Sequence, residues 1–386
     1  MKKISLLINL TILLLLLSSC STDPQISPLL ETDNKELTLD KPLNIDDNSE
    51  ISFFNNEKLY FFTSETVKKD TESANMNFYE YIFDQEKSNI INSFTDITFH
   101  TGSKTIIDDK LYFPLTQNNQ NILLEIRMEN KKTKTIKKWT SYPPFSYVFN
   151  TNNHIVLFGP NTPDNSKIEY SIDTLNLENN QENNIVKKII KDGEGELISS
   201  IDVDGEYIFA FSTTIKNNKH EYSVIKYDLT GKEIIKYPFD LQSFFKTDKT
   251  LINKDDTIFS MYKEGNYFIL NTLNGRIFIF KLIDNQLQAV KIPENYYEEN
   301  PSGFHFMEYT DEESDFAYFY NSFEKNNEVT VFNYLTEEFT TIGFPKEETS
   351  LYEFFRNAKG DLIVKRTNNS SANDFFHFKR EDLFEE

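Results

Sequence analysis

The chain has 386 residues, of which 61 are Asp or Glu and 40 are Lys or Arg, so its formal net charge is −21 at pH 7. An acidic surface of this size repels the phosphates of nucleic acids, which excludes nucleic acid as an expected partner. The single cysteine excludes a disulfide within the chain and a metal site built from several cysteines. Apolar residues make up only 38% of the chain, but 35 Phe and 20 Tyr provide enough aromatic side chain for a large core.

Residues 1–19 have the layout of a secretory signal peptide. A short cationic start is followed by a run from Ile4 to Leu17 that is almost entirely apolar. The run is shorter than the about 20 residues that a membrane-spanning helix needs, and it ends in small residues rather than a basic cluster. We therefore expect this segment to be cleaved from the mature chain.

The end of the signal, Leu17-Ser18-Ser19-Cys20, resembles the lipobox of bacterial lipoproteins. The resemblance covers only the first 20 residues and implies cleavage between Ser19 and Cys20, with acyl chains such as palmitate on Cys20. Two or three such chains anchor a protein stably to a membrane. The expected location is the extracytoplasmic face of the cell membrane, or the outer membrane where the source has two membranes. The alternative is an ordinary signal peptide followed by an incidental cysteine.

Residues 20–35 form the predicted lipidated N-terminus and tether. This segment is polar and contains Pro24 and Pro28, as is typical of a flexible linker. The remaining residues, 36–386, are predicted to form one repetitive domain.

A pattern of four strands recurs along residues 36–386. An aromatic strand, a polar turn, a second apolar strand and two further strands follow one another in each copy. The second strand of the seven copies is predicted to begin near Leu59, Leu111, Ile155, Tyr207, Tyr267, Phe316 and Leu362. These positions are separated by intervals close to the roughly 40 to 50 residues of a propeller blade. The pattern predicts an all-β protein, a β-propeller with seven four-stranded blades; six or eight blades, or two separate β domains, are the alternatives.

Turn signals support the repeat. Asp204-Gly205 and Asn274-Gly275 stand between apolar strands and favour the positive φ angles of tight hairpins. Tyr227–Ile234 and Asn357–Val364 resemble strand–turn signatures of several bacterial β-propeller families. Because the last copy has a weak fourth strand, we expect Glu36–Leu39 to supply or reinforce that strand and close the ring.

The sequence contains no nucleophile elbow, paired metal-binding histidines, phosphate-binding loop or Cys-x-x-Cys motif, and we expect no cofactor. The five histidines stand far apart, without a second ligand at metal-binding spacing: His100, His154, His220, His305 and His377. Three acidic groups precede second strands: Asp108-Asp109, Asp202 with Asp204, and Asp255-Asp256. They could bind a cation on one face, but Asp is also a preferred turn residue and no calcium-loop pattern is present, so no metal site is predicted.

Aromatic residues near prolines are the candidate ligand contacts, because they fall in predicted connections between repeats, where binding residues are common. They are Trp139, Tyr142, Phe145, Tyr296 and Tyr297. The alternative is that they pack between neighbouring blades.

Two functions follow from these patterns. The first is a membrane-anchored lipoprotein whose propeller is a non-enzymatic binding or scaffold module for a protein or glycan. The alternative is an extracytoplasmic glycan-active hydrolase or lyase, in which carboxylates would converge on one face of the propeller. In a third reading, the cleaved signal segment itself acts as a secreted peptide signal.

Overall fold

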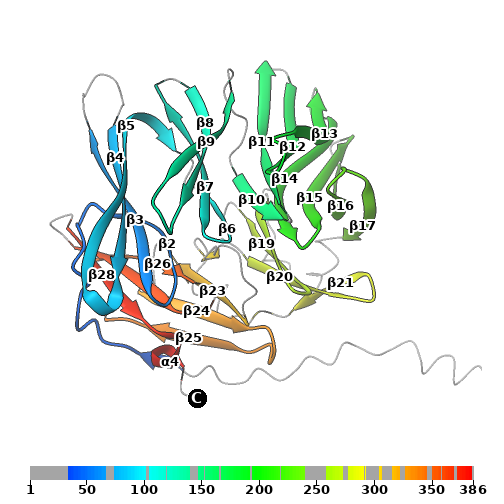
Figure 1. Cartoon of the computed structure of the whole chain (residues 1–386). Helices are drawn as coiled ribbons and strands as arrows, with labels where there is room; N and C mark the ends of the chain where they lie inside the picture. Colours follow the sequence, from blue (N-terminus) through cyan, green and yellow to red (C-terminus); the bar gives the residue numbers. More distant parts are fainter. Residues whose placement is uncertain are drawn as a thin grey trace, which may run out of the picture. The chain divides into compact units, whose positions relative to one another are not determined.

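The computed structural model describes residues 34–66, 74–100, 104–118, 120–139, 147–151, 153–164, 167–191, 194–217, 219–239, 258–272, 277–290, 292, 304–306, 315–321, 327–345, 350–357, 359–368 and 372–384. All of them belong to one compact unit, Thr32–Glu386. The described strands form five sheets, two of which, with eight strands each, join two successive groups of four strands. The seven groups that follow one another along the chain are the blades of a β-propeller (Figure 1). The all-β, seven-bladed prediction is confirmed.

The first four blades are β2 (Glu50–Phe54), β3 (Lys58–Thr66), β4 (Ala74–Ile82) and β5 (Lys87–His100); β6 (Thr105–Ile107), β7 (Lys110–Gln117), β8 (Gln120–Arg127) and β9 (Thr133–Trp139); β10 (Tyr147–Thr151), β11 (His154–Asp164), β12 (Lys167–Asn176) and β13 (Glu182–Lys191); and β14 (Glu194–Asp204), β15 (Tyr207–Lys216), β16 (Lys219–Asp228) and β17 (Glu233–Phe239). The last three blades are β18 (Ile258–Glu264), β19 (Tyr267–Thr272), β20 (Ile277–Ile283) and β21 (Gln286–Val290); β22 (Phe304–Phe306), β23 (Phe316–Asn321), β24 (Glu328–Asn333) and β25 (Phe339–Gly343); and β26 (Leu351–Arg356), β27 (Leu362–Thr367) and β28 (Asn373–Phe378). The second strand of each blade begins at its predicted position or one residue before it.

Short antiparallel pairings connect the outer strand of one blade to the next blade in two places. Ile97, Phe99 and His100 of β5 pair with β7, and Ile190 and Lys191 of β13 pair with β14. The helices in the described part are a 3₁₀ turn, Phe83–Gln85, and α4, Arg380–Leu383. No helix among the described residues is long and apolar enough to cross a membrane.

Side-chain alternation explains why the strands read as continuous apolar runs. In β15, Ile208 and Ala210 pack against blade 3, whereas Phe209 and Phe211 pack against blade 5. Successive residues of a strand point to opposite faces, so a blade between two neighbours buries both faces. Seven apolar clusters result, one for each pair of neighbouring blades, including the pair formed by the last and the first blade.

The corner after the third strand is tied to the turn after the first strand in five blades. In each case a backbone amide at the corner donates to a carbonyl of that turn, at 2.7–3.0 Å. The pairs are Phe83 with Glu57, Met128 with Asp109, Leu177 with Asn153, Leu282 with Asn266, and Tyr334 with Asp315. The resembling segment Tyr227–Ile234 forms the equivalent corner of blade 4, and the Asp228 carboxylate accepts the amides of Thr230 and Lys232 at 2.9 and 3.0 Å.

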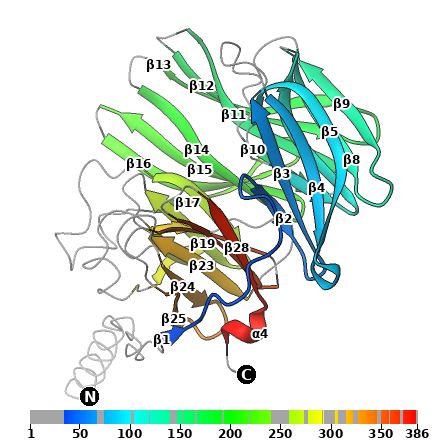
Figure 2. The same ribbon diagram turned by 90° about the vertical axis from the view of Figure 1, so that its left-hand side faces the viewer.

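The N-terminal segment 34–47, here called the strap, corrects the expected mode of ring closure. Its strand β1 (Asn34–Glu36) pairs in parallel with β25 of blade 6, and blade 7 keeps three strands in the described part. The strap then passes blade 7, where the Leu43 amide donates to the Phe375 carbonyl at 2.6 Å (Figure 2). Leu37 and Leu39 pack against blades 6 and 7, and Leu43 and Ile45 pack against blades 7 and 1; the strap therefore covers the closing blade without adding a strand to it.

Candidate functional site

The predicted lipidation and cleavage residues, Ser19 and Cys20, lie outside the described residues. The same holds for four of the five candidate aromatic contacts, Tyr142, Phe145, Tyr296 and Tyr297. Their roles stay predictions.

Trp139 is the one candidate aromatic residue in the described part. It ends β9, packs against the cluster between blades 2 and 3, and donates from Nε1 to a Glu182 carboxylate oxygen at 3.3 Å. Lys137 binds the other oxygen of the same carboxylate at 2.7 Å. The contacts of Trp139 join two blades, which agrees with the alternative that these aromatic residues pack between neighbouring blades.

The described acidic turns serve the backbone or a neighbouring blade. The Asp109 carbonyl accepts the corner amide of its own blade, and Asp108 has a positive φ of 55°. Asp204 forms an ion pair with Lys263 of blade 5. Asp255 and Asp256 lie outside the described residues.

No group of three or more His, Cys, Asp or Glu side chains in the described ranges is placed to hold a metal ion. His154 contacts the Asn176 amide nitrogen at 3.2 Å, and His220 makes an edge contact with Tyr222. His377 stacks on Phe83 with ring centroids 4.0 Å apart. The side chains of His100 and His305 lie outside the described part.

Three charged side chains act electrostatically on the phenol of Tyr334, and together with it we call them the inner polar cluster: Asp202, Glu264, Tyr334 and Arg356. Asp202 lies on β14, Glu264 and Arg356 end β18 and β26, and Tyr334 directly follows β24. The first strands of blades 4 and 5 contact each other, as do those of blades 7 and 1. Glu264, Tyr334 and Arg356 are only 7%, 8% and 4% exposed and are shielded from water, whereas Asp202 is half-buried.

A chain of contacts connects Asp202 to Tyr334. The Asp202 carboxylate accepts the backbone amide of Lys263 at 2.6 Å and that of Val203 at 2.7 Å. Glu264 follows Lys263 and pairs with Tyr267 in the β18–β19 ladder. The Tyr267 hydroxyl lies 2.9 Å from the Tyr334 carbonyl oxygen.

A second set of contacts connects Tyr334 to Arg356. The Tyr334 amide donates to the Asp315 carbonyl at 2.9 Å, and Nη1 of Arg356 donates to the adjacent Phe316 carbonyl. The Arg356 guanidinium also lies over the Tyr318 ring, 5.3 Å from its centroid. Backbone and ring contacts thus hold the guanidinium at the Asp315–Phe316 segment, to which the Tyr334 amide is also bound.

Burial dominates the electrostatics of the cluster. Removal from water lowers the pKa of Arg356 to about 10, and the charge of Glu264 opposes this effect. Burial raises the pKa of the Tyr334 phenol, with opposite contributions from Arg356, which lowers it, and from Glu264 and Asp202, which raise it. At neutral pH the cluster therefore contains a charged arginine and a neutral tyrosine.

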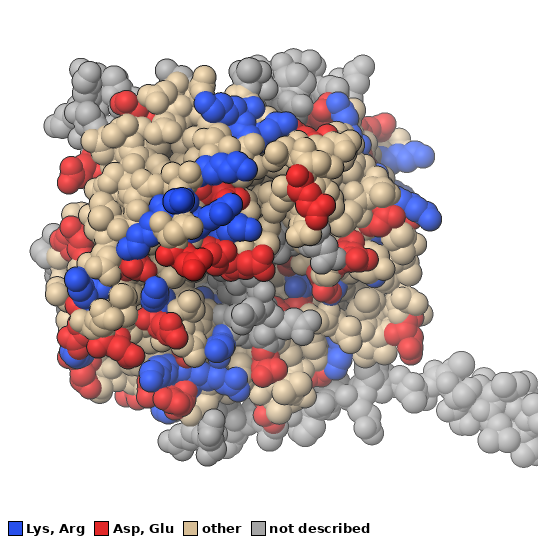
Figure 3. All heavy atoms as spheres, viewed as in Figure 1, with Lys and Arg blue, Asp and Glu red and all other residues tan. Residues whose placement is uncertain are grey.

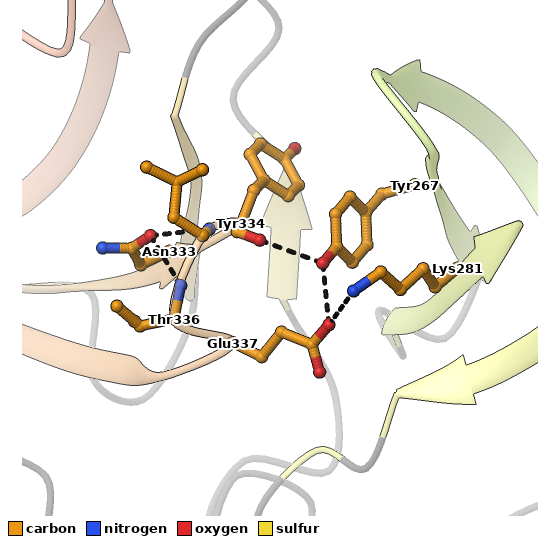
Figure 4. Close-up of polar contacts among 7 residues, drawn as sticks. Tyr267, Lys281, Asn333, Tyr334, Thr336 and Glu337 are labelled. Carbon is orange, nitrogen blue, oxygen red and sulfur yellow. Dashed lines mark hydrogen bonds and ion pairs between the residues drawn. The ribbon is translucent and has the colours of Figure 1, made fainter. Parts of the chain in front are cut away.

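The backbone of Tyr334 is held by a second polar group, shown in Figure 4. The Tyr267 hydroxyl lies 2.9 Å from both the Tyr334 carbonyl and Oε1 of Glu337, and Lys281 forms an ion pair with the same carboxylate. The hydrogen bond from Lys281 lowers the pKa of Glu337. The side-chain oxygen of Tyr334 points away from these contacts (Figure 4), so the network fixes the backbone and leaves the phenol directed elsewhere.

Sequence reasoning did not identify Glu264, Tyr334 or Arg356. A signal exists for two of them: Glu264 and Arg356 are the last residues of first strands and pair with Tyr267 and Leu362. Asp204 has the same position in blade 4, where it pairs with Tyr207. Superposing the repeats would therefore have placed Glu264 and Arg356 beside the acidic turns.

No family model matches the chain, and neither does any curated protein sequence. Solved structures share the fold. The β-propeller domain of the Trilobed protease from Pyrococcus furiosus, described as having an open velcro topology, is 9% identical with a TM-score of 0.54; the match covers 86% of this chain and 96% of that one. An acylaminoacyl peptidase from Pyrococcus horikoshii is 8% identical with a TM-score of 0.55, over 87% of this chain and 53% of that one.

An acylaminoacyl peptidase solved with Z-Gly-Gly-Phe-chloromethyl ketone gives the same picture, with 8% identity, a TM-score of 0.55 and coverage of 89% of this chain and 53% of that one. The chain spans about half the length of these two peptidases. At such identities the likeness shows the β-propeller fold.

Proposed function

We propose that this chain is an extracytoplasmic lipoprotein, anchored through acyl chains on Cys20, whose β-propeller is a binding or scaffold module rather than an enzyme. The anchor is supported by the apolar run that ends in Leu17-Ser18-Ser19-Cys20 and by the polar residues that follow it. The expected partners are the membrane, through the acyl chains, and a protein or glycan ligand.

One observation carries the non-enzymatic part of the proposal: the carboxylates near the inner strands are used to join blades. Asp202 accepts the Lys263 amide, and Asp204 binds the Lys263 ammonium. A general base must reach the proton that it removes with an available oxygen, and these oxygens already have structural partners. The same is true of Glu337, which binds Lys281.

The surface agrees with a soluble domain held at a membrane by lipid rather than by its own charge. Lys and Arg are interspersed with Asp and Glu over the face in Figure 3. The net charge of −21 opposes direct contact with an anionic bilayer.

The anchor is tested by intact-mass analysis and membrane fractionation of the native protein beside a Cys20→Ala variant. We expect the native mass to correspond to cleavage before Cys20 plus acyl chains, and the variant to leave the membrane fraction. An unlipidated native protein, or a variant that stays in the membrane, would overturn the anchor.

A second candidate function, a glycan-active hydrolase or lyase, is favoured by the charges of Glu264 and Asp202, which act on the same Tyr334 phenol. Glycoside hydrolysis depends on a pair of carboxyl groups that flank the scissile bond. The test is release of reducing ends from soluble glycans by the native chain, a Glu264→Gln variant and a control, Glu221→Gln, at an exposed position of β16. Turnover that Glu264→Gln abolishes and Glu221→Gln retains would replace the non-enzymatic proposal.

A further inference from the structure

The outer strand of blade 2 carries a run of lysines in a chain that is acidic as a whole. Lysine occupies five of the eight positions 131–138, and no Asp or Glu stands among them, whereas the whole chain has 61 acidic and 40 basic residues. Lys and Arg side chains gather over blade 2 in Figure 3, which has the orientation of Figure 1. The surface charge is thus reversed locally, so an anionic partner fits at this strand although the net charge would repel it elsewhere.

Two of these lysines join blades, and the other three are available to a partner. Lys131 and Lys137 bind carboxylates of blades 1 and 3, at 3.1 and 2.7 Å. The ammonium groups of the others form no ion pair among the described residues, and their side chains are exposed: Lys132, Lys134 and Lys138. Three positive charges therefore face the solvent without a carboxylate from the described part of the chain.

The outer edge of β9 is open in the described part of the chain. β9 pairs with β8, and no described strand pairs with its other side. The outer strands β5 and β13 instead pair in part with the following blade, and β25 pairs with β1. An open edge presents backbone N–H and C=O groups, with which a further extended segment can form a ladder.

The chain itself shows that the outer edge of a blade accepts a fifth strand. Asn34–Glu36 pairs with Thr341–Gly343 of β25, and the amide of Leu37 donates to the Gly343 carbonyl at 2.9 Å. β25 contains no lysine, whereas β9 contains three. A segment added to β9 would occupy the equivalent place in blade 2 and would meet ammonium groups there.

The lysines of β9 lie on both faces of the strand and select an acidic segment. Lys137 is opposite Leu123, which packs toward blade 3, and Lys138 is opposite Ile122, which packs toward blade 1. Opposite charges on neighbouring strands stabilise their pairing, and like charges destabilise it. An apolar strand is disfavoured because the ammonium groups would lose water, and a second copy of β9 is disfavoured because lysines would face lysines.

We propose that β9 docks an extended acidic segment of a partner protein, which adds a fifth strand to blade 2. The inference rests on the proposed function as a binding module and names the chemistry of its partner. A polypeptide fits better than an anionic glycan, because it offers both carboxylates for the lysines and N–H and C=O groups for the strand edge. The competing explanation is that the lysines only protect an open edge from pairing with other strands.

The test uses the full chain, purified in detergent, and a fluorescent peptide with blocked ends, Thr-Glu-Glu-Val-Thr-Glu-Thr. In an antiparallel pairing this acidic peptide places a Glu opposite each lysine of β9. Three probes are matched to it. Thr-Glu-Glu-Pro-Pro-Glu-Thr keeps the carboxylates but cannot form the ladder, a peptide with Lys in place of Glu reverses the charge, and trigalacturonate carries the same number of carboxylates on a glycan.

Binding is measured by fluorescence anisotropy, with the matched probes as competitors, and by hydrogen exchange of the backbone amides. We expect the acidic peptide to bind and the three matched probes to leave it bound. We also expect the acidic peptide to slow exchange in β9 and to leave exchange in β17, the outer strand of blade 4, unchanged.

Variants assign the binding to β9. The double variant Lys134→Glu/Lys138→Glu reverses two of the available charges, and we expect it to weaken binding of the acidic peptide at least about tenfold, because favourable cross-strand pairs become repulsive. The control Lys216→Glu/Lys219→Glu makes the same change in net charge at exposed positions of blade 4 and should keep the native affinity. All four side chains are exposed, so both variants should fold.

Four results would overturn the inference: no binding of the acidic peptide, equal binding of the proline peptide, equal binding of trigalacturonate, or equal affinity of the native chain and Lys134→Glu/Lys138→Glu. The first means that the lysines only protect the edge, and the second and third mean that they bind anions without an added strand. A chain that is lipidated and binds no acidic peptide would overturn this inference and leave the anchor standing. An unlipidated chain that binds the acidic peptide would do the reverse.

Discussion

Replacing Arg356 by Met tests whether the inner polar cluster is a coupled unit. Arg356 is 4% exposed, and its guanidinium donates to the Phe316 carbonyl and lies over the Tyr318 ring. Loss of a charged hydrogen bond costs about 1.5–3 kcal/mol and loss of a shielded cation–ring contact about 1–2 kcal/mol. We therefore expect Arg356→Met to lower the free energy of unfolding by about 3–5 kcal/mol, the range found for breaking buried ion pairs.

The double variant gives the decisive number. Glu264→Gln alone removes a negative charge that compensates the charge of Arg356, whereas the double variant removes both charges. The double variant should therefore lower the free energy of unfolding by about 1–3 kcal/mol less than the sum of the two single variants. The assay is equilibrium urea unfolding followed by both Trp139 fluorescence and circular dichroism, with coincident transitions required. The control is Lys365→Met, which breaks an exposed ion pair with Glu353 in the same blade and should cost less than about 1 kcal/mol. Additive losses would refute the coupling of Arg356 with Glu264.

Three further predictions concern the fold. Urea unfolding should show that Gly231→Ala lowers the free energy of unfolding by about 3 kcal/mol and Gly205→Ala by about 1 kcal/mol. Both residues have a positive φ, but only at Gly231 would a methyl group collide with a carbonyl of β13, so equal decreases would contradict this explanation. Burial lowers the pKa of His377, so the unfolded chain binds the proton more readily and stability should fall as the pH drops below the ordinary value of 6.5. Melting temperatures at pH 7.5 and 5 should therefore differ less in His377→Phe than in the native chain; an identical pH dependence would exclude His377 as the source. Deleting the strap, residues 34–47, should cost about 4 kcal/mol, because four half-buried apolar side chains lose about 1 kcal/mol each, and an unchanged melting temperature would show that the ring closes without it.

The repeat could be predicted because local signals and burial agree. Residues such as Phe209 and Ile208 face different neighbouring blades, so both sets of alternating positions in a strand are apolar. Each strand is therefore recognisable as an apolar run between polar turns. Asp204-Gly205 marks the turn between β14 and β15, where Gly205 has a φ of 59°. Positions of second strands follow from such signals alone.

The partner of the N-terminal strand could not be predicted in the same way. Leu37 and Leu39 alternate with polar residues, which indicates an extended segment with one buried side. Nothing in that alternation distinguishes a parallel pairing with β25 from an antiparallel pairing with β28. The choice depends on tertiary packing, which places Leu37 and Leu39 between blades 6 and 7.

The inner polar cluster was missed because its members are distant in the sequence and differ in chemistry. Asp202 and Arg356 are joined only when blades 4 to 7 are arranged around the inner strands. The acidic turns were found, and one of their expected roles was right: Asp202 accepts the amide of the next residue, Val203. Its bond to the Lys263 amide of the next blade carries no local sequence signal.

Ion pairs connect successive blades of this acidic chain. Successive blade interfaces, from the first to the fifth, each contain a lysine bound to a carboxylate: Lys131 with Glu80, Lys137 with Glu182, Lys188 with Glu196, Lys263 with Asp204, and Lys281 with Glu337. Between the last and the first blade, the described contacts include the apolar cluster to which Leu59, Phe61 and Phe375 belong, the stacking of His377 on Phe83, and the apolar side chains of the strap. The last interface thus combines an apolar core with a buried histidine and with a segment that leads directly to the proposed tether. Acidification and loss of the strap should therefore weaken the same junction, while the lysine–carboxylate interfaces elsewhere keep their charges near neutral pH.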